Sequence, residues 1–110
     1  MIINKTSFKS ITIDSKTYDH DVWVFADGSI KERNRNHEFT IEEFQIITRN
    51  NPEILIIGTG QYGVVKIREE VFKAAKKRGI ELVIDKTPVA IKRFNEIKGK
   101  RIAGAFHTTC

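Results

Sequence analysis

From residue 40 onward, segments with helical spacing alternate with short apolar segments typical of buried strands. The predicted helices cover residues 40–50, 68–78 and 87–98, and the predicted strands cover 53–57, 82–84 and 101–106. Strands separated by helices favour parallel pairing, with the helices on the faces of the sheet. This alternation predicts an α/β fold with parallel strands at its centre.

Signals at the helix ends set the boundaries of these segments. Thr40 and Glu43 form a capping box, in which each side chain is expected to bind the other residue's free backbone N–H, and Phe39 and Phe44 have the spacing of a hydrophobic staple. The second helix is predicted to end at Gly79 and to place Val71, Phe72 and Ala75 on its inward side. Thr87-Pro88 is predicted to cap and start the third helix.

The first third of the chain has the alternation of β-structure. Residues 10–14 predict one strand, followed by a turn at Ser15-Lys16 and a return strand from Thr17. Residues 21–25 are apolar on both faces, which predicts a strand covered on both sides. Asp27-Gly28 predicts a turn between antiparallel strands, so that the whole sheet is mixed. Residues 31–37 are too polar for a core face and predict an exposed loop.

The size and composition fit one domain covering residues 1–110. No segment approaches the roughly 20 apolar residues that span a bilayer, so no membrane partner is expected. Cys110 is the single cysteine, which excludes an internal disulfide and favours the cytoplasm. No feature of the sequence indicates the oligomeric state.

The positive charge is concentrated in the second part of the chain. Residues 1–65 hold seven Lys/Arg against nine Asp/Glu, whereas residues 66–110 hold twelve against five. Such a basic half is either a solvated helix surface or a surface for an acidic partner. Lys73, Lys76 and Lys77 on the second helix are the candidate partner-binding residues. Nucleic acid is a weaker hypothesis, because neither exposed aromatic residues nor a known nucleic-acid module is visible.

A glycine motif follows the first strand of the parallel core. Residues 58–63 match G-x-G-x-x-G, and Asp85 lies near the position of a ribose-binding acid. The extended segment 64–67 separates the motif from its helix, which weakens the dinucleotide interpretation because the helix N-terminus should meet the phosphates. A smaller phosphate or nucleotide ligand stays open as an alternative. The candidate ligand-binding residues are Gly58, Thr59, Gly60, Asp85, Thr87 and His107.

Other chemical signals are weak. His107 and Cys110 have the spacing of two metal ligands, but a zinc site needs three or four. The same pair suggests a thiolate nucleophile, yet chain termini fray and no positioned base is visible. We therefore predict no catalytic residues, no metal site and no cofactor.

Several segments resemble a known family. They are Ile54–Gly60, Lys76–Ile80 with the strand after it, Ala90, the pair Phe94-Asn95, and the segment Arg101–Cys110. Together they resemble the adipogenesis-associated Mth-domain family, to which a mitochondrial complex I assembly factor is more distantly related. The resemblance implies a three-layer α/β fold with a mixed five-stranded central sheet and a small N-terminal β-layer. It implies no catalytic residues, and it implies action through protein partners.

Two functions are therefore expected as alternatives. The first is a non-enzymatic protein-binding or assembly module. The second is a small-ligand or enzymatic pocket at the carboxyl ends of the parallel strands, where open α/β sheets bind ligands.

Overall fold

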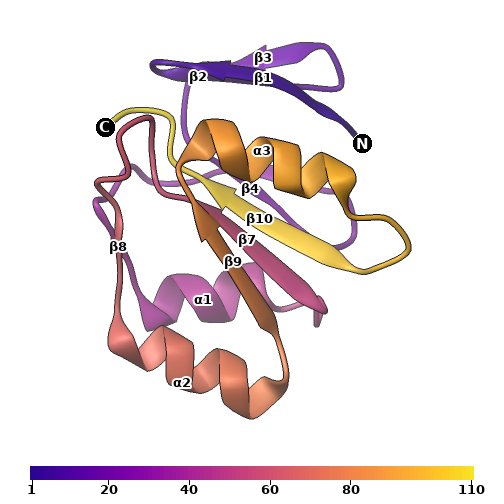
Figure 1. Cartoon of the computed structure of the whole chain (residues 1–110), viewed down its shortest axis with the longest axis vertical. Coiled ribbons are helices and arrows are strands. Elements are labelled where there is room, and N and C mark those ends of the chain that lie inside the picture. Colours follow the sequence, from indigo (N-terminus) through magenta and orange to yellow (C-terminus); the bar gives the residue numbers. More distant parts are fainter.

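A mixed five-stranded sheet forms the centre of the computed structural model, which describes residues 1–110 (Figure 1). Its strand order is β5-β4-β10-β7-β9. Strands β7, β9 and β10 are parallel, as their separation by helices predicts, and β4 and β5 add to β10 as an antiparallel ribbon. The bounds are β4 Val22–Val24, β5 Ile30–Glu32, β7 Ile54–Gly58, β9 Glu81–Asp85 and β10 Ile102–Phe106.

Each face of the sheet has its own apolar core. Helices α1 (Ile41–Ile47) and α2 (Glu69–Arg78) cover one face, and the core between them and the sheet includes Phe44, Leu55 and Ala105. Helix α3 (Thr87–Glu96) covers the other face together with a three-stranded antiparallel sheet, over Ile11, Ile56 and Phe106 (Figure 1). The strands of this sheet are β1 Ile3–Ser7, β2 Ser10–Ile13 and β3 Lys16–Tyr18. The predicted three-layer architecture with its small N-terminal β-layer is confirmed.

Strand β4 lies between the two cores, as its two apolar faces predict. Val22 and Val24 belong to the core under α3, whereas Trp23 and Phe25 pack into the core under α1 and α2. The turn at Asp27-Gly28 joins the antiparallel strands β4 and β5, as predicted.

Two details of the N-terminal β-structure differ from the predictions. The turn between β2 and β3 lies at Asp14 and Ser15, which have φ angles of 49° and 69°, and Lys16 already belongs to β3. Residues 31–37 are not all an exposed loop, because Lys31 and Glu32 extend β5 and Arg33 is buried. Polarity alone gives the wrong place for Arg33, because its charge is balanced by Asp21 and Glu43, which lie 12 and 10 residues away in the chain.

The helix boundaries are close to those predicted, but three side-chain roles differ. Thr40 caps α1 by accepting the Glu43 N–H, yet the Glu43 carboxylate turns inward instead of closing the capping box. Lys86, not Thr87, is the N-cap of α3. Phe72 is 46% exposed rather than inward, while Val71 and Ala75 are buried and Gly79 ends α2 in the left-handed conformation.

The segment between the glycine motif and α2 is extended, as predicted. It contains β8 (Lys66–Ile67), which pairs in parallel with β6 (Glu38–Phe39). Helix α2 therefore begins at Glu69, well beyond the last glycine of the motif. No helix in the structure is long and apolar enough to cross a membrane.

Candidate functional site

The predicted ligand-binding residues converge at the carboxyl ends of β7, β9 and β10. The Thr87 hydroxyl connects two of these strand ends, because it accepts the Gly60 N–H at 2.9 Å and donates to the His107 carbonyl at 2.6 Å. The Thr59 N–H and hydroxyl both donate to the Asp85 carbonyl, and the His107 N–H donates to the Gly58 carbonyl. These contacts make the region a hydrogen-bonded junction of the parallel strands.

The space beside the glycine turn is occupied by the C-terminal segment Thr108–Cys110. Gly60 has a φ of 110°, and a Cβ there would lie 2.4 Å from the Cys110 carbonyl carbon. The N–H groups of Gln61 and Tyr62 donate to the carbonyls of Thr109 and Cys110 at 2.7 and 2.8 Å. The chain's own backbone explains why this turn needs glycine, and the ligand-binding role of its residues stays a prediction.

Asp21 is the centre of a buried polar cluster beside this junction. Its carboxylate binds His107 Nδ1 at 2.7 Å and accepts both the N–H and the hydroxyl of Thr108 at 2.9 Å. Burial alone would raise the pKa of Asp21, but the hydrogen bonds from His107 and Thr108 outweigh it and lower that pKa to about 2. Asp21 is therefore a carboxylate at neutral pH.

Arg33 extends the cluster toward α1. Its guanidinium donates to Asp21 at 2.9 Å and makes two contacts with the Glu43 carboxylate. It also donates to the carbonyls of Asn36 and Glu38. Such a fork of donors suits Arg rather than Lys, since it engages several acceptors in one plane. The cluster thus ties β4, α1 and the segment after β5 to β10.

The geometry around His107 has the form of a hydroxyl–imidazole–carboxylate relay. The Thr109 hydroxyl lies 3.0 Å from His107 Nε2, opposite the Asp21 contact on Nδ1. A nucleophile needs access to its substrate as well as a positioned base. Thr109 is only 6% exposed and His107 1% exposed, and neither cavity of the molecule is lined by them. The arrangement satisfies buried polar groups and anchors the C-terminal segment, which is therefore held rather than frayed.

Sequence reasoning missed most of this cluster. The sequence predicts a strand at Asp21, an exposed loop at Arg33 and a capping box at Glu43, with no sign that the three side chains meet. His37 was not expected near His107, yet their rings lie edge to face with centroids 5.3 Å apart. The available signal was an Asp at the start of an otherwise apolar strand, because such a group is buried only with partners.

The predicted partner-binding residues lie on the surface of α2. Lys73, Lys76 and Lys77 are all exposed, and Lys73 makes only a long 3.9 Å pair with Glu69. Exposed pairs of this kind restrain a side chain weakly. The three ammonium groups are therefore available to solvent, and their role in partner binding stays a prediction.

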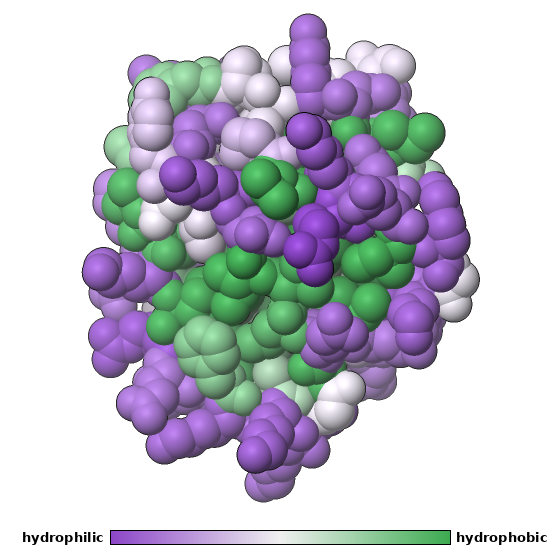
Figure 2. Space-filling view, viewed as in Figure 1, coloured by the Kyte–Doolittle hydropathy of each residue, from purple (hydrophilic) through white to green (hydrophobic).

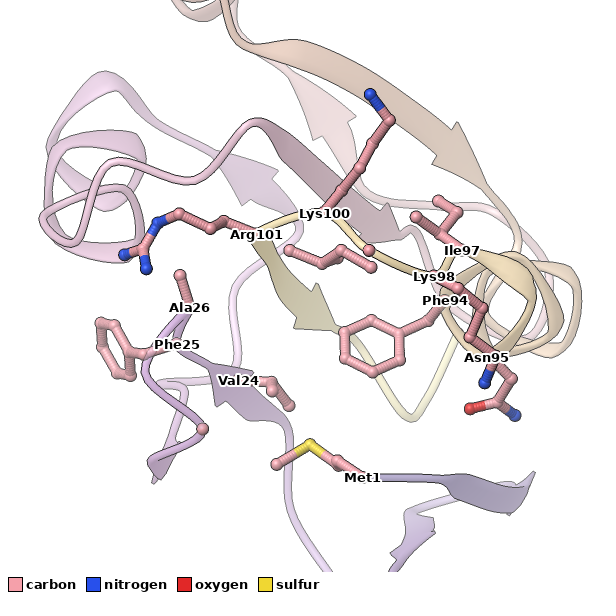
Figure 3. Close-up of a pocket in the computed structure, with 13 residues that line it drawn as sticks. Met1, Val24, Phe25, Ala26, Phe94, Asn95, Ile97, Lys98, Lys100 and Arg101 are labelled. Carbon is pink, nitrogen blue, oxygen red and sulfur yellow. The ribbon is translucent and has the colours of Figure 1, made fainter.

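The two cavities of the molecule lie away from the predicted ligand-binding residues. One, of about 370 Å³, opens at the opposite end of β10, where Phe94, Val24 and Met1 face into it and Lys100 points away (Figure 3). The other, of about 660 Å³, is an open groove between His37 and the start of α2. None of the predicted ligand-binding residues lines either cavity.

The fold and this closed junction define a three-layer α/β domain with a sealed polar cluster. A family model described as a protein of unknown function (DUF498/DUF598) matches residues 3–107. The chain belongs to this family.

Solved structures agree with this membership. A conserved hypothetical protein from Pyrococcus horikoshii is 29% identical over 100% of both chains, with a TM-score of 0.90. A protein designated MT938 is 28% identical over 99% of this chain and 98% of its own, with a TM-score of 0.82. A Mth938-like domain from Bordetella pertussis has a TM-score of 0.73, covering 97% and 85%, and at 14% identity it shares the fold alone.

Proposed function

We propose that this protein is a non-enzymatic protein-binding or assembly module of the cytoplasm, similar in action to the adipogenesis-associated Mth-domain family. One observation carries the proposal: the junction at the strand ends is filled by the chain's own segment Thr108–Cys110, while the basic face of α2 is free. Function then belongs to the surface rather than to a pocket.

The charge distribution supports the choice of surface. Lys73, Lys76 and Lys77 occupy consecutive turns on the exposed face of α2, and residues 66–110 carry the excess of basic groups. A concentration of one sign attracts partners of the other sign and orients their encounter.

Charge reversal of this face tests the proposal. The protein would be purified gently from its own cells and analysed by native mass spectrometry, alongside a variant with Lys73→Glu, Lys76→Glu and Lys77→Glu. We expect a stoichiometric protein partner with the unmodified chain and none with the variant.

A matched control carries Lys5→Glu, Lys98→Glu and Lys100→Glu, which are also exposed and change the net charge equally. It should retain the partner. Equal loss of the partner in both variants would mean that net charge rather than this face determines binding. If the unmodified chain is also found without a protein partner, the proposed binding module is contradicted.

The second candidate is a phosphate or nucleotide ligand at Gly58-Thr59-Gly60. It is favoured by the N–H groups of Gln61, Tyr62 and Val64, which all donate to main-chain oxygens of the segment Thr109-Cys110 and would be offered to an anion if that segment moved. Native mass spectrometry separates the two candidates, because this one requires a stoichiometric small-molecule adduct. Nucleic acid would instead show affinity that falls steeply with salt.

A further inference from the structure

The two edges of the central sheet are protected very differently. Strand β5 forms one edge, is only three residues long and ends in the exposed charges Lys31 and Glu32. Strand β9 forms the other edge, spans five residues and has Leu82, Val83 and Ile84 at its centre. Short, charged strands resist edge pairing, whereas longer apolar ones invite it. Strand β9 is therefore the edge of the central sheet that favours pairing with another strand.

The hydrogen-bonding register leaves two residues of β9 without main-chain partners. The Glu81 N–H donates to the Glu53 carbonyl, and the Asp85 carbonyl accepts from the Thr59 N–H. The main-chain N–H and C=O groups of residues 81, 83 and 85 therefore point toward β7. Alternation along the strand points the N–H and C=O groups of Leu82 and Ile84 outward. No loop or turn bonds to them. We call these outward groups the β9 edge.

An exposed apolar side chain, Phe72, borders the β9 edge on the α2 side. On α2, Val71 and Ala75 face the sheet, and Arg78 donates to Thr48 at the C-terminal end of α1. The helical spacing therefore puts Phe72 on the side of α2 away from α1, toward β9. On α3, Ala90, Ile91 and Phe94 face the sheet, so the helical spacing puts Val89 on the outer side of that helix. Phe72 is 46% and Val89 45% exposed. Figure 2 shows an apolar band crossing this side of the molecule, bordered by hydrophilic side chains.

The charges around the β9 edge select the occupant. Residues 73–93 contain seven Lys/Arg against two Asp/Glu, and one of these acids, Asp85, is within 3.5 Å of Arg93. A second copy of the chain fits poorly: antiparallel pairing about Val83 would place Glu81 opposite Asp85 of the other copy and bring two lysine-rich helices together. Like charges in these positions oppose pairing.

We propose that the β9 edge binds an extended segment of another protein, in which apolar residues alternate with Asp or Glu, as a sixth strand of the central sheet. The main-chain groups of Leu82 and Ile84 would supply the hydrogen bonds, Phe72 would contact an apolar side chain, and the surrounding lysines would attract the acids. This inference rests on the proposed function and names the partner's chemistry.

An octapeptide of alternating valine and glutamate tests the proposal. Binding would be followed by hydrogen exchange and by the amide NMR signals of the full chain. In the free protein the amides of Leu82 and Ile84 should exchange rapidly and those of Val83 and Asp85 slowly. The peptide should protect Leu82 and Ile84 specifically, while the corresponding valine–lysine octapeptide should not bind.

A single substitution and its matched control locate the contact. Phe72→Glu should weaken binding of the valine–glutamate peptide by about tenfold, whereas Ile46→Glu, an equally drastic change at a 41% exposed position on α1, should leave it unchanged. Both sites are on the surface, so both variants should fold.

Three outcomes would overturn the proposal. They are peptide binding without protection of Leu82 and Ile84, protection of these amides by self-association in the absence of peptide, and binding of a mixed-sequence oligonucleotide in place of the peptide. In the first case the proposed function survives if the lysine reversal still removes the natural partner, because the partner then docks on α2 alone.

Discussion

Asp21 shows how much one buried side chain can organise. It accepts hydrogen bonds from His107, Thr108 and Arg33, all of which are buried. The exposed Arg35 lies 3.8 Å from the same carboxylate. Burying such a group is costly by itself, and a buried ion pair adds little net stability over an apolar pair of the same shape. Removing one member is different, because the remaining charges keep their burial and lose their partner.

Asp21→Asn is therefore expected to lower the free energy of unfolding by about 3 kcal/mol. The amide has nearly the same shape, but it leaves the Arg33 guanidinium with only the Glu43 carboxylate as a charged acceptor. Urea denaturation followed by circular dichroism measures the change. Asp27→Asn, in the exposed turn after β4, is the control and should change the unfolding midpoint far less.

The low pKa of Asp21 makes the protein's stability depend on acid in a defined window. Because the pKa falls from an ordinary value of 3.8 to about 2 on folding, the stabilisation is complete above pH 4. It is lost as the pH falls through 2, where the folded carboxylate takes up its proton. The unfolding free energy of the unmodified protein should fall more steeply than that of Asp21→Asn between pH 4 and 2. Parallel curves would show that other carboxylates dominate.

At the scale of single elements, helix α1 is short and depends on its ends. It has seven residues, its N-cap is Thr40, and its Glu43 carboxylate serves the buried cluster instead of the cap. A helix of this length is marginal without capping and tertiary contacts. The side-chain cap at its N-terminus is the hydrogen bond from the Glu43 N–H to Thr40 Oγ1, at 3.2 Å.

Thr40→Ala should destabilise the protein by about 1 kcal/mol, because the Glu43 N–H loses its acceptor. Thr40→Asp restores an acceptor and should recover most of the loss. Thermal and urea unfolding of the three proteins measure the difference. If alanine and aspartate behaved alike, the cap would contribute nothing beyond its packing.

At the scale of the whole molecule, the N-terminal β-layer is joined to α3 by one side chain that imitates a strand. The Asn95 amide accepts the Ile3 N–H at 2.9 Å and donates to the Ile3 carbonyl at 2.8 Å. Apolar residues of β1 and β2 then pack over α3 and the central sheet. Both hydrogen bonds fall on one residue of β1, so this contact fixes the position of that strand on the helix.

Asn95→Ala should cost about 2 kcal/mol, because it leaves the Ile3 N–H and carbonyl without partners. Asn95→Asp keeps the acceptor and loses the donor, so its effect should be intermediate at most. Hydrogen exchange should show faster opening in β1 and β2 than in β7 and β10. Uniformly faster exchange would mean that the layer and the sheet unfold together.

Local patterns predicted most of the fold. The helix beginning at Thr40, the Gly79 end of α2 and the three parallel strands are set by caps, punctuating residues and runs of apolar residues, all of which act over a few positions. The errors have tertiary causes. The helical period predicts that Phe72 faces inward, but the sheet ends at β9, so nothing covers the side of α2 that carries Phe72.

The candidate site was predicted only in part. Gly58, Gly60, Thr87 and His107 do meet, because parallel strands bring their carboxyl ends to one edge of the sheet. Arg33 and Asp21 were missed as a pair, because Arg33 lies in a polar run that carries no local sign of burial.

The sequence by itself determined the order and type of the elements, the parallel core and the basic second half, since these depend on spacing, capping and composition. Only the tertiary structure decided what fills the strand ends and which sheet edge stays open. Asp21 and His107 are 86 residues apart in the chain and 2.7 Å apart in space. No local pattern records such a contact, because it forms only when the burial of two separate apolar cores has placed every strand.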